Sequence, residues 1–236
     1  MAEHEFAERV VVITGASSGI GLATAEAFAR SGALVAIFAR SAEKLNEIAK
    51  QHADRMIAVS GDVADSASID RLFSETEKRF GDCEILVNNA GMIDPKPLVD
   101  VTPDAWDRMF AVNVRGTYLA SRRALQKMLA KRSGAIVNVA SISGVIGPSK
   151  FPGWVSYNAS KAAVIAMTEA LAVEVGKEGV RVNSVSPGSV DTKMWSDASG
   201  GAPADMTPDE IAETILFLAG ARSRPMNGQN LNVWSV

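Results

Sequence analysis

Short apolar runs alternate with longer segments of helical period along most of the chain. The runs are rich in Val and Ile and predict seven strands, at residues 9–14, 34–39, 56–60, 85–88, 135–140, 181–186 and 230–233. The first six are apolar at nearly every position, which is typical of strands that are buried on both faces. The pattern therefore predicts an α/β fold in which helices cover both faces of a parallel sheet.

The intervening segments predict helices at residues 20–31, 42–51, 66–80, 103–131, 156–177 and 208–219. Thr102 and Thr207 each precede a proline and an acidic residue, which indicates a helix start with proline in the first turn. No repeat, charge block or linker divides the chain, so residues 1–236 are expected to form one doubly wound domain. The small and polar residues at 196–206 predict a mobile substrate loop at about 194–207.

Composition narrows the classes of partner. The net charge of −3 gives no basic surface for nucleic acid, and 47% hydrophobic content supplies a full core. The single cysteine, Cys83, cannot form an intrachain disulfide, which fits a reducing compartment. The charged start MAEHEFAERV lacks a signal-peptide core, and no apolar run is long enough to span a membrane. We therefore expect a cytoplasmic protein with no nucleic-acid partner, no membrane association and no metal site.

A glycine-rich turn, TGASSGIG at 14–21, follows the first predicted strand and opens the first predicted helix. Gly15, Gly19 and Gly21 let the backbone turn tightly, and a helix N-terminus offers free N–H groups to an anion. This position predicts the phosphate cradle of a Rossmann-type dinucleotide site, although a glycine turn can also be purely structural.

The end of the second strand carries Arg40 where an acid that binds the ribose 2′-hydroxyl is expected. A guanidinium suits a 2′-phosphate, so NADP(H) is favoured and NAD(H) is the alternative. Arg40 could instead project into solvent, and Ser18 in the glycine turn gives no further support for a phosphate. Asp62, Ser141 and Gly188 also follow predicted strands, and they are expected to converge on the same edge of the sheet.

A tyrosine and a lysine stand four residues apart in WVSYNASKAAV, at the start of a predicted helix. This spacing puts Tyr157 and Lys161 on one helical face. A phenol has a pKa near ~10 and needs a nearby positive charge to act as an acid or base at neutral pH. Lys161 would supply that charge and lower the pKa of Tyr157. The pair alone is weak evidence, but Ser141 and Asn113 give it polar company.

Six motifs together carry a resemblance to a known family. They are TGASSGIG, NNAG at 88–91, Asn113, the serine that follows VNVA, YNASK at 157–161 and PGSVDT at 187–192. In this order they resemble the short-chain dehydrogenase/reductase family, and in general appearance its 3-oxoacyl-carrier-protein reductases. The likeness runs from residue 9 to residue 233, nearly the whole chain.

The resemblance implies a reversible oxidoreductase that interconverts a carbonyl and a secondary alcohol. Tyr157 would be the general acid or base, Lys161 would bind the nicotinamide ribose, Ser141 would hold the substrate oxygen and Asn113 would hold a water of a proton relay. The implied cofactor contacts are Gly15, Ser17, Ser18, Gly19, Ile20, Gly21, Arg40, Asp62, Val63, Asn89, Ala90, Gly91, Tyr157, Lys161, Pro187, Gly188, Val190 and Thr192.

The substrate contacts follow from the same resemblance. Ser141 and Tyr157 are 16 residues apart, more than is usual in the family, so GPSKFPGW is expected to carry an insertion that borders the substrate. The expected contacts are Ser141, Ser143, Trp154, Tyr157, Met194 and Trp195. A short loop with small residues favours a small or medium carbonyl or alcohol.

The sequence also bears on partner proteins and on assembly. Arg132 fits a carrier-protein docking site, but Glu178 at the second position would oppose an acidic carrier. The helix at 156–177 is apolar around most of its circumference, which with the resemblance indicates a homo-oligomer, a dimer or a tetramer.

A catalytically silent dinucleotide-binding regulator is the alternative function. An epimerase or dehydratase would need a longer substrate domain. Trp234 could pack on a neighbouring subunit or on the substrate pocket.

Overall fold

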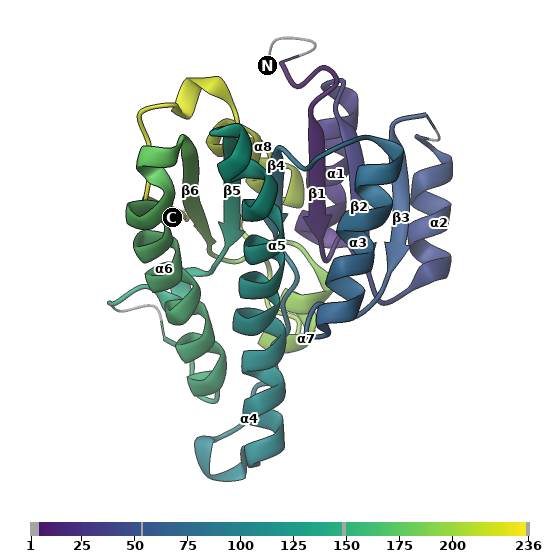
Figure 1. Ribbon diagram of the computed structural model, residues 1–236. Coiled ribbons are helices and arrows are strands. Elements are labelled where there is room, and N and C mark those ends of the chain that lie inside the picture. The colour runs from purple at the N-terminus through teal and green to yellow at the C-terminus, as the bar shows by residue number, and fades with distance from the viewer. Residues whose placement is uncertain (1–4, 53, 148–149, 235–236) are drawn as a thin grey trace.

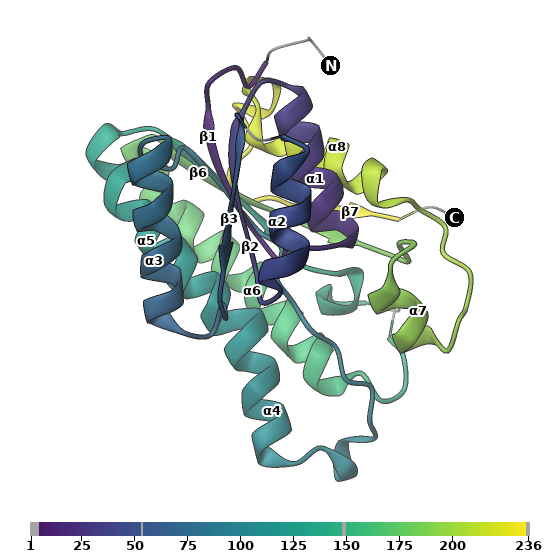
Figure 2. The same cartoon turned by 90° about the vertical axis from the view of Figure 1, so that its right-hand side faces the viewer.

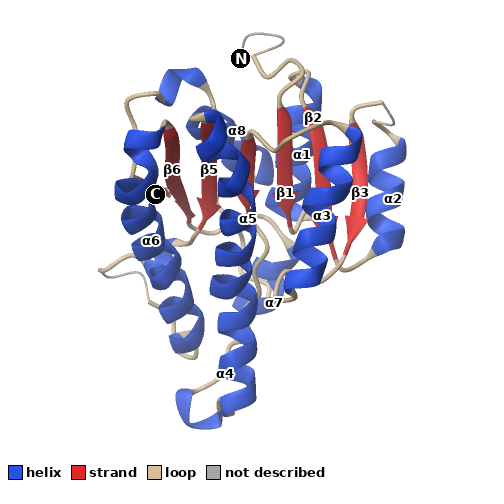
Figure 3. Cartoon of the chain, viewed as in Figure 1, coloured by secondary structure: helices blue, strands red, loops and turns tan. Residues whose placement is uncertain are grey.

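The computed structural model describes residues 5–52, 54–147 and 150–234, and it contains a seven-stranded parallel sheet (Figure 1 and Figure 3). The strand order is β3-β2-β1-β4-β5-β6-β7. All seven predicted strands are confirmed, and the ends of three of them shift by one residue. The strands are β1 (Val10–Thr14), β2 (Leu34–Ala39), β3 (Met56–Ser60), β4 (Ile85–Asn88), β5 (Gly134–Val139), β6 (Val180–Pro187) and β7 (Asn230–Val233).

Helices cover both faces of the sheet, as the apolar runs predict (Figure 2). Ile13 of β1 packs in one core with Phe28 of α1 (Gly19–Arg30) and Ile215 of α8 (Pro208–Ala219), and α2 (Ala42–Lys50) lies on the same face. Its neighbour Val12 points the other way, into a second core with Leu72 of α3 (Ser66–Arg79). Helices α5 (Gly116–Lys131) and α6 (Val155–Val175) complete that face. Alternation along β1 thus produces two cores around one sheet.

The predicted helix starts at the two Thr-Pro pairs are confirmed. The Thr102 hydroxyl accepts a hydrogen bond from Ala105 N at the start of α4 (Pro103–Phe110). Thr207 and Glu210 form a capping box at the start of α8, in which each side chain bonds the other residue's backbone N–H. Both prolines stand in the first helical turn, where no N–H is required.

One predicted helix and one predicted loop need correction. The segment at 103–131 is not a single α-helix, because a π turn at Ala111–Arg115 separates α4 from α5. The expected loop at 194–207 begins as a helix, α7 (Lys193–Ser199), which Thr192 caps by accepting a hydrogen bond from Trp195 N. Short 3-10 turns lie at Leu98–Asp100, Ile142–Gly144, Gly176–Glu178 and Ala221–Ser223.

The carboxyl ends of the strands point to one edge of the sheet, the lower edge in Figure 1, and α7 lies below that edge. β1 lies between β2 and β4, so the chain order reverses there, which is where an open α/β sheet leaves a crevice for ligands. Helix α4 extends beyond the same edge (Figure 1). No helix in the described part of the chain is both long enough and apolar enough to cross a membrane.

Candidate active site

A cavity of about 890 Å³ opens at the carboxyl edge of the sheet. It is lined by the glycine turn, the ends of β2 to β6, the start of α6 and helix α7. Every residue that the sequence predicts as a cofactor, substrate or catalytic contact lines this cavity, except Gly21 and Asn113. The structure therefore brings residues from most of the chain length into one continuous site.

The glycine turn is shaped by two residues with left-handed backbone. Gly15 has φ +69° and Gly19 has φ +55°, a region that a side chain disfavours. A Cβ on Gly15 would also lie 2.7 Å from the Cα of Ala90, so the turn and the end of β4 need this close approach. The Ser18 side chain makes no capping hydrogen bond within the described structure, so it leaves the first N–H groups of α1 open to an anion.

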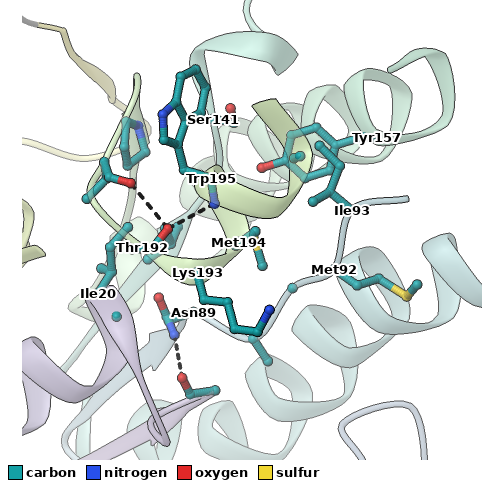
Figure 4. Close-up of a pocket in the computed structure, with 18 of the residues that line it drawn as sticks. Ile20, Asn89, Met92, Ile93, Ser141, Tyr157, Thr192, Lys193, Met194 and Trp195 are labelled. Atoms are coloured by element: carbon teal, nitrogen blue, oxygen red, sulfur yellow. Dashed lines mark hydrogen bonds between the residues drawn. The ribbon is translucent and has the colours of Figure 1, made fainter. Parts of the chain in front are cut away.

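The side chain of Asn89 holds the glycine turn in place through hydrogen bonds to its backbone. Its Nδ2 donates to the carbonyl oxygens of Thr14 at 3.1 Å and Gly15 at 2.9 Å, and Figure 4 shows one of these bonds as a dashed line. The Thr14 hydroxyl accepts hydrogen bonds from the backbone N–H groups of Asn89 and Ala90. Gly21 packs against the Asn89 side chain and does not line the cavity. A Cβ added to Gly21 would lie 2.3 Å from Asn89 Nδ2.

Two basic side chains line the end of the cavity at β2. Arg40 is exposed, and Lys44 stands one turn into α2, whose N-cap Ser41 accepts a hydrogen bond from Lys44 N. Lys44 was not among the residues predicted from the sequence. The sequence does contain a signal for this residue: a lysine in the first turn of the helix that follows β2.

Asp62 follows β3 at the same end, and both of its oxygens accept hydrogen bonds. Ala64 N donates to Oδ1 at 2.9 Å and Arg108 Nη2 donates to Oδ2 at 2.8 Å. Burial acts to raise the pKa of Asp62, but these two partners, with the charge of Arg40, lower it overall. The carboxylate is therefore ionised and held by Arg108, which the sequence analysis did not identify. An adenine contact at Asp62 stays a prediction.

Tyr157 and Lys161 lie on one face of α6, as their spacing predicts, but they do not bond each other. Lys161 Nζ donates to the carbonyl of Val139 at 2.8 Å and lies 5.8 Å from the centre of the Tyr157 ring. Burial lowers the pKa of Lys161 to about 8. Both side chains are buried at the cavity wall.

The predicted lowering of the Tyr157 pKa is wrong for the protein alone. Burial raises the pKa of Tyr157 to about 12, and a hydrogen bond with the Ser141 side chain opposes that rise. The Lys161 ammonium donates to Val139 O rather than to the phenol. The Tyr157 hydroxyl points toward Ser141 and Trp195 in Figure 4. The site thus holds the phenol in its protonated form.

Ser141 is positioned by the turn that follows β5. Its hydroxyl accepts a hydrogen bond from Ser143 N at 3.2 Å and caps the 3-10 turn Ile142–Gly144. A Cβ on Gly144 would lie 2.6 Å from the backbone of Lys161 and Ala162, so glycine lets this turn lie directly on α6. The sequence analysis did not identify this role of Gly144.

Asn113 lies in the π turn and is almost fully buried, at 1% exposure. Its Oδ1 accepts from Met92 N, and its Nδ2 donates to Met92 O and to the Ser160 hydroxyl. π turns inside α-helices are frequent at functional sites. Here the turn directs Asn113 toward the loop after β4 and toward α6, so its side chain positions Met92 and the Tyr157 helix. A water-holding role for Asn113 stays a prediction.

The substrate end of the cavity has its own small apolar cluster. Trp154 and Tyr157 are buried with Met109, and the ring of Trp195 from α7 packs against them. Thr192 fixes the start of α7 by accepting from Trp195 N and donating to Val190 O, and Met194 lies beside this turn (Figure 4).

Trp234 also lines the cavity, where its ring would be 3.2 Å from a Cβ on Gly188. This supports the pocket alternative for Trp234 within one chain. Lys150 and Phe151 line the cavity as well, from the expected insertion, and the sequence analysis named neither of them. Pro148 and Ser149 of that insertion, and the last two residues of the chain, lie outside the described residues.

Comparison with known proteins decides the family. The family model described as short chain dehydrogenase matches residues 9–201. The chain belongs to the short-chain dehydrogenase family. This is a family of oxidoreductases, and the order of motifs in the sequence had predicted it.

Relatives and solved structures agree with that assignment. The chain is 39% identical to cis-4-hydroxycyclohexanecarboxylate dehydrogenase of Sinomonas cyclohexanicum, over 91% of this chain and 90% of the relative. It is 37% identical to 2-(R)-hydroxypropyl-CoM dehydrogenase of Xanthobacter autotrophicus, over 94% and 96% of the two chains. The crystal structure of a 3-ketoacyl-(acyl-carrier-protein) reductase from Brucella melitensis, complexed with NADH, superposes with a TM-score of 0.89 at 32% identity, covering 96% of this chain and 97% of that one.

Proposed function

We propose that the protein is an NADP(H)-dependent oxidoreductase that interconverts a carbonyl and a secondary alcohol. One observation carries the proposal: the hydroxyls of Tyr157 and Ser141 and the ammonium of Lys161 lie in the same cavity as the glycine turn. A dinucleotide that reaches from that turn along the strand ends would end beside Tyr157. The two relatives named above are, by their names, dehydrogenases of hydroxylated compounds, and they support the same reaction class.

In carbonyl reduction, Tyr157 would donate its phenolic proton to the substrate oxygen and Ser141 would hydrogen-bond that oxygen as negative charge develops. In the protein alone burial raises the pKa of Tyr157 to about 12, so a positive charge near the hydroxyl would be needed to make its proton transferable near neutral pH. In alcohol oxidation Tyr157 would accept the proton instead. Lys161, held by Val139 at the end of β5, would place a positive charge near the phenolate and bind the ribose of the cofactor.

The residues at the glycine turn fit a dinucleotide. Gly15 and Gly19 have left-handed backbone, the N-terminus of α1 is open to an anion, and both glycines line the cavity. When bound, the nicotinamide supplies the hydride, while the protein supplies placement and polarisation. Arg40 and Lys44 would bind the 2′-phosphate of NADP(H), because two cations line the cavity where a binder of the free 2′-hydroxyl would carry an acid.

The substrate is proposed to be a small molecule rather than a carrier-protein thioester. Arg132, at the C-terminal end of α5, forms an ion pair with Glu178 and also donates to Lys177 O. Because Glu178 already neutralises Arg132, this arginine would attract an acidic carrier protein only weakly. We therefore use the likeness to a 3-ketoacyl-(acyl-carrier-protein) reductase for the fold and the reaction class only. We do not propose that this chain binds a carrier protein.

The homo-oligomer expected from the sequence also stays part of the proposal. Val173 of α6 is 83% exposed and Val155 is 45% exposed, so part of the apolar surface of this helix is uncovered in one chain. A second copy would cover it. Sedimentation of the protein should give a dimer or tetramer, and Val173→Asp should shift it toward the monomer; a monomeric wild type would contradict this part.

The reaction class is tested by turnover. The protein is mixed with NADPH or NADH and with ketones, diketones, oxoacyl thioesters and keto-sugars, while nicotinamide absorbance is followed. We expect oxidation of NADPH with at least one carbonyl class. A panel that is silent with both nucleotides, from protein that still binds them, would instead favour the silent dinucleotide-binding regulator.

A further inference from the structure

Four aromatic rings meet at the substrate end of the cavity. The centre of the Trp154 ring lies 4.7 Å from that of Phe151, 5.7 Å from Tyr157 and 6.3 Å from Trp195. All four residues line the cavity, and they come from the loop after β5, from α6 and from α7. We call Phe151, Trp154 and Trp195 the aromatic wall. It stands directly beside the phenol that, in the proposed function, donates its proton to the substrate oxygen.

The aromatic wall is held in place by the protein. Trp154 is only 7% exposed and packs with Met109. The indole N–H of Trp195 donates to Ala202 O at 2.9 Å, which fixes α7 against the following loop. Phe151, in contrast, is 45% exposed although it faces a cavity. Preformed aromatic surfaces of this kind bind either flat apolar groups or cations.

Charge around the aromatic wall decides between those two ligands. Lys150 Nζ lies 2.6 Å from the carbonyl oxygens of Ser143 and Val145, and no carboxylate pairs with it among the described residues. Two other lysines line the cavity at this end: Lys193 is paired with Asp197, and Lys161, beside Tyr157, donates to Val139 O. The Asp205 carboxylate, which also lines the cavity, accepts a hydrogen bond from the Ser189 hydroxyl. The charges at this end that are in no ion pair among the described residues are thus two ammonium groups, of Lys150 and Lys161, and one carboxylate, of Asp205. Their balance is positive, and it would repel a cationic ligand.

We infer that the substrate carries an apolar ring that packs on the aromatic wall, and that Lys150 selects rings with an acidic substituent over rings with a cationic one. This inference rests on the proposed function and names its substrate class. The segment between Ser141 and Tyr157, which is expected to carry an insertion, supplies Lys150, Phe151 and Trp154. The lengthened loop is therefore a specificity element, and neither Lys150 nor Phe151 takes part in the proton transfer itself.

The ring preference is tested by comparing acetophenone with methyl hexyl ketone, which has the same number of carbon atoms. With NADPH we expect kcat/KM to be about tenfold higher for acetophenone, from aromatic packing. Phe151→Ala should remove most of that preference and leave the Kd for NADPH unchanged. Phe80→Ala, which truncates a phenylalanine outside the cavity, should keep it. Equal kcat/KM values for the two ketones in the wild type would overturn the inference while leaving the proposed function intact.

The charge preference is tested with para-acetylbenzoate and para-trimethylammonioacetophenone. We expect a lower KM for the carboxylate, by about tenfold, from one partly exposed charge pair. Lys150→Met should abolish the difference, whereas Lys96→Met, whose lysine pairs with Asp94 outside the cavity, should preserve it. Preference for the trimethylammonium ketone would overturn the inference. Absence of turnover with every ketone and both nucleotides would overturn the proposed function, and this inference with it.

Discussion

The two halves of the cavity are built in different ways. At the nucleotide half, backbone atoms at the ends of β1 and β4 are locked together by Asn89 and Thr14, and close approaches at Gly15 and Gly21 leave no room for a side chain. At the substrate half, Trp154 and the other large side chains from a loop and from α7 pack on one another. Backbone geometry thus determines the first half, and the choice of side chains determines the second.

The largest difference between the halves is expected for glycine substitutions. Gly21→Ala would place a Cβ 2.3 Å from Asn89 Nδ2 and 2.4 Å from Gly15 O. The turn must shift, so we expect the free energy of unfolding to fall by about 2–3 kcal/mol and NADPH to bind roughly a hundredfold more weakly. Urea unfolding and a fluorescence titration with NADPH measure the two effects.

Gly200→Ala is the control for Gly21→Ala in the substrate half. Gly200 has φ +70° but open space around it, so only backbone strain of ~1 kcal/mol is expected, with no change in the Kd for NADPH. An equal loss of NADPH affinity in both variants would remove the distinction between the halves.

This distinction also explains what the sequence could and could not predict. Buried strands and the glycine turn leave local patterns, so the sheet and the position of the turn around Gly15 follow from the sequence. The π turn at Asn113 and the capture of Lys161 by Val139 depend on contacts between distant segments, and no local pattern reveals them. Phe151 was missed because a single aromatic residue in a loop has no periodicity that would show which way it points.

The next largest effect concerns the cofactor. Arg40→Asp replaces a cation beside the proposed 2′-phosphate with an anion, so the ratio of kcat/KM for NADPH to that for NADH should fall about a hundredfold. Lys44→Met should lower the same ratio by less, because it removes one cation without adding an anion. Lys50→Asp makes the same charge change at the far end of α2, outside the cavity, and should leave the ratio as it is. Unchanged ratios in all three variants would show that neither Arg40 nor Lys44 reads the phosphate.

A smaller effect concerns the buried amine of Lys161 and the dependence of the free energy of unfolding on pH. Burial lowers the pKa of Lys161 from 10.5 to about 8, so between these pH values the unfolded chain binds more protons than the folded chain. The free energy of unfolding should therefore rise with pH across this window, by at most ~1.4 kcal/mol per pH unit. Lys161→Met should lack this rise in urea unfolding series at matched pH values. Parallel curves for wild type and variant would contradict the assigned pKa shift.

The smallest effect is expected in the substrate half. Trp195→Phe keeps an aromatic ring but loses the hydrogen bond to Ala202 O. We expect the KM for a ketone substrate to rise about threefold, since a single neutral hydrogen bond contributes about 1 kcal/mol or less. The Kd for NADPH should not change. A change in that Kd as large as the change in KM would show that α7 also belongs to the nucleotide half.

The central claim, proton transfer by Tyr157, has a matched control because the chain has only two tyrosines, Tyr157 and Tyr118. Tyr118 is 48% exposed on α5 and does not line the cavity. The direct measurement is NADPH oxidation with an accepted ketone, alongside an NADPH titration, for Tyr157→Phe and Tyr118→Phe. We predict that Tyr157→Phe binds NADPH within about twofold of wild type and loses at least ~1,000-fold in kcat/KM, while Tyr118→Phe retains both. Wild-type turnover by Tyr157→Phe would contradict the claim.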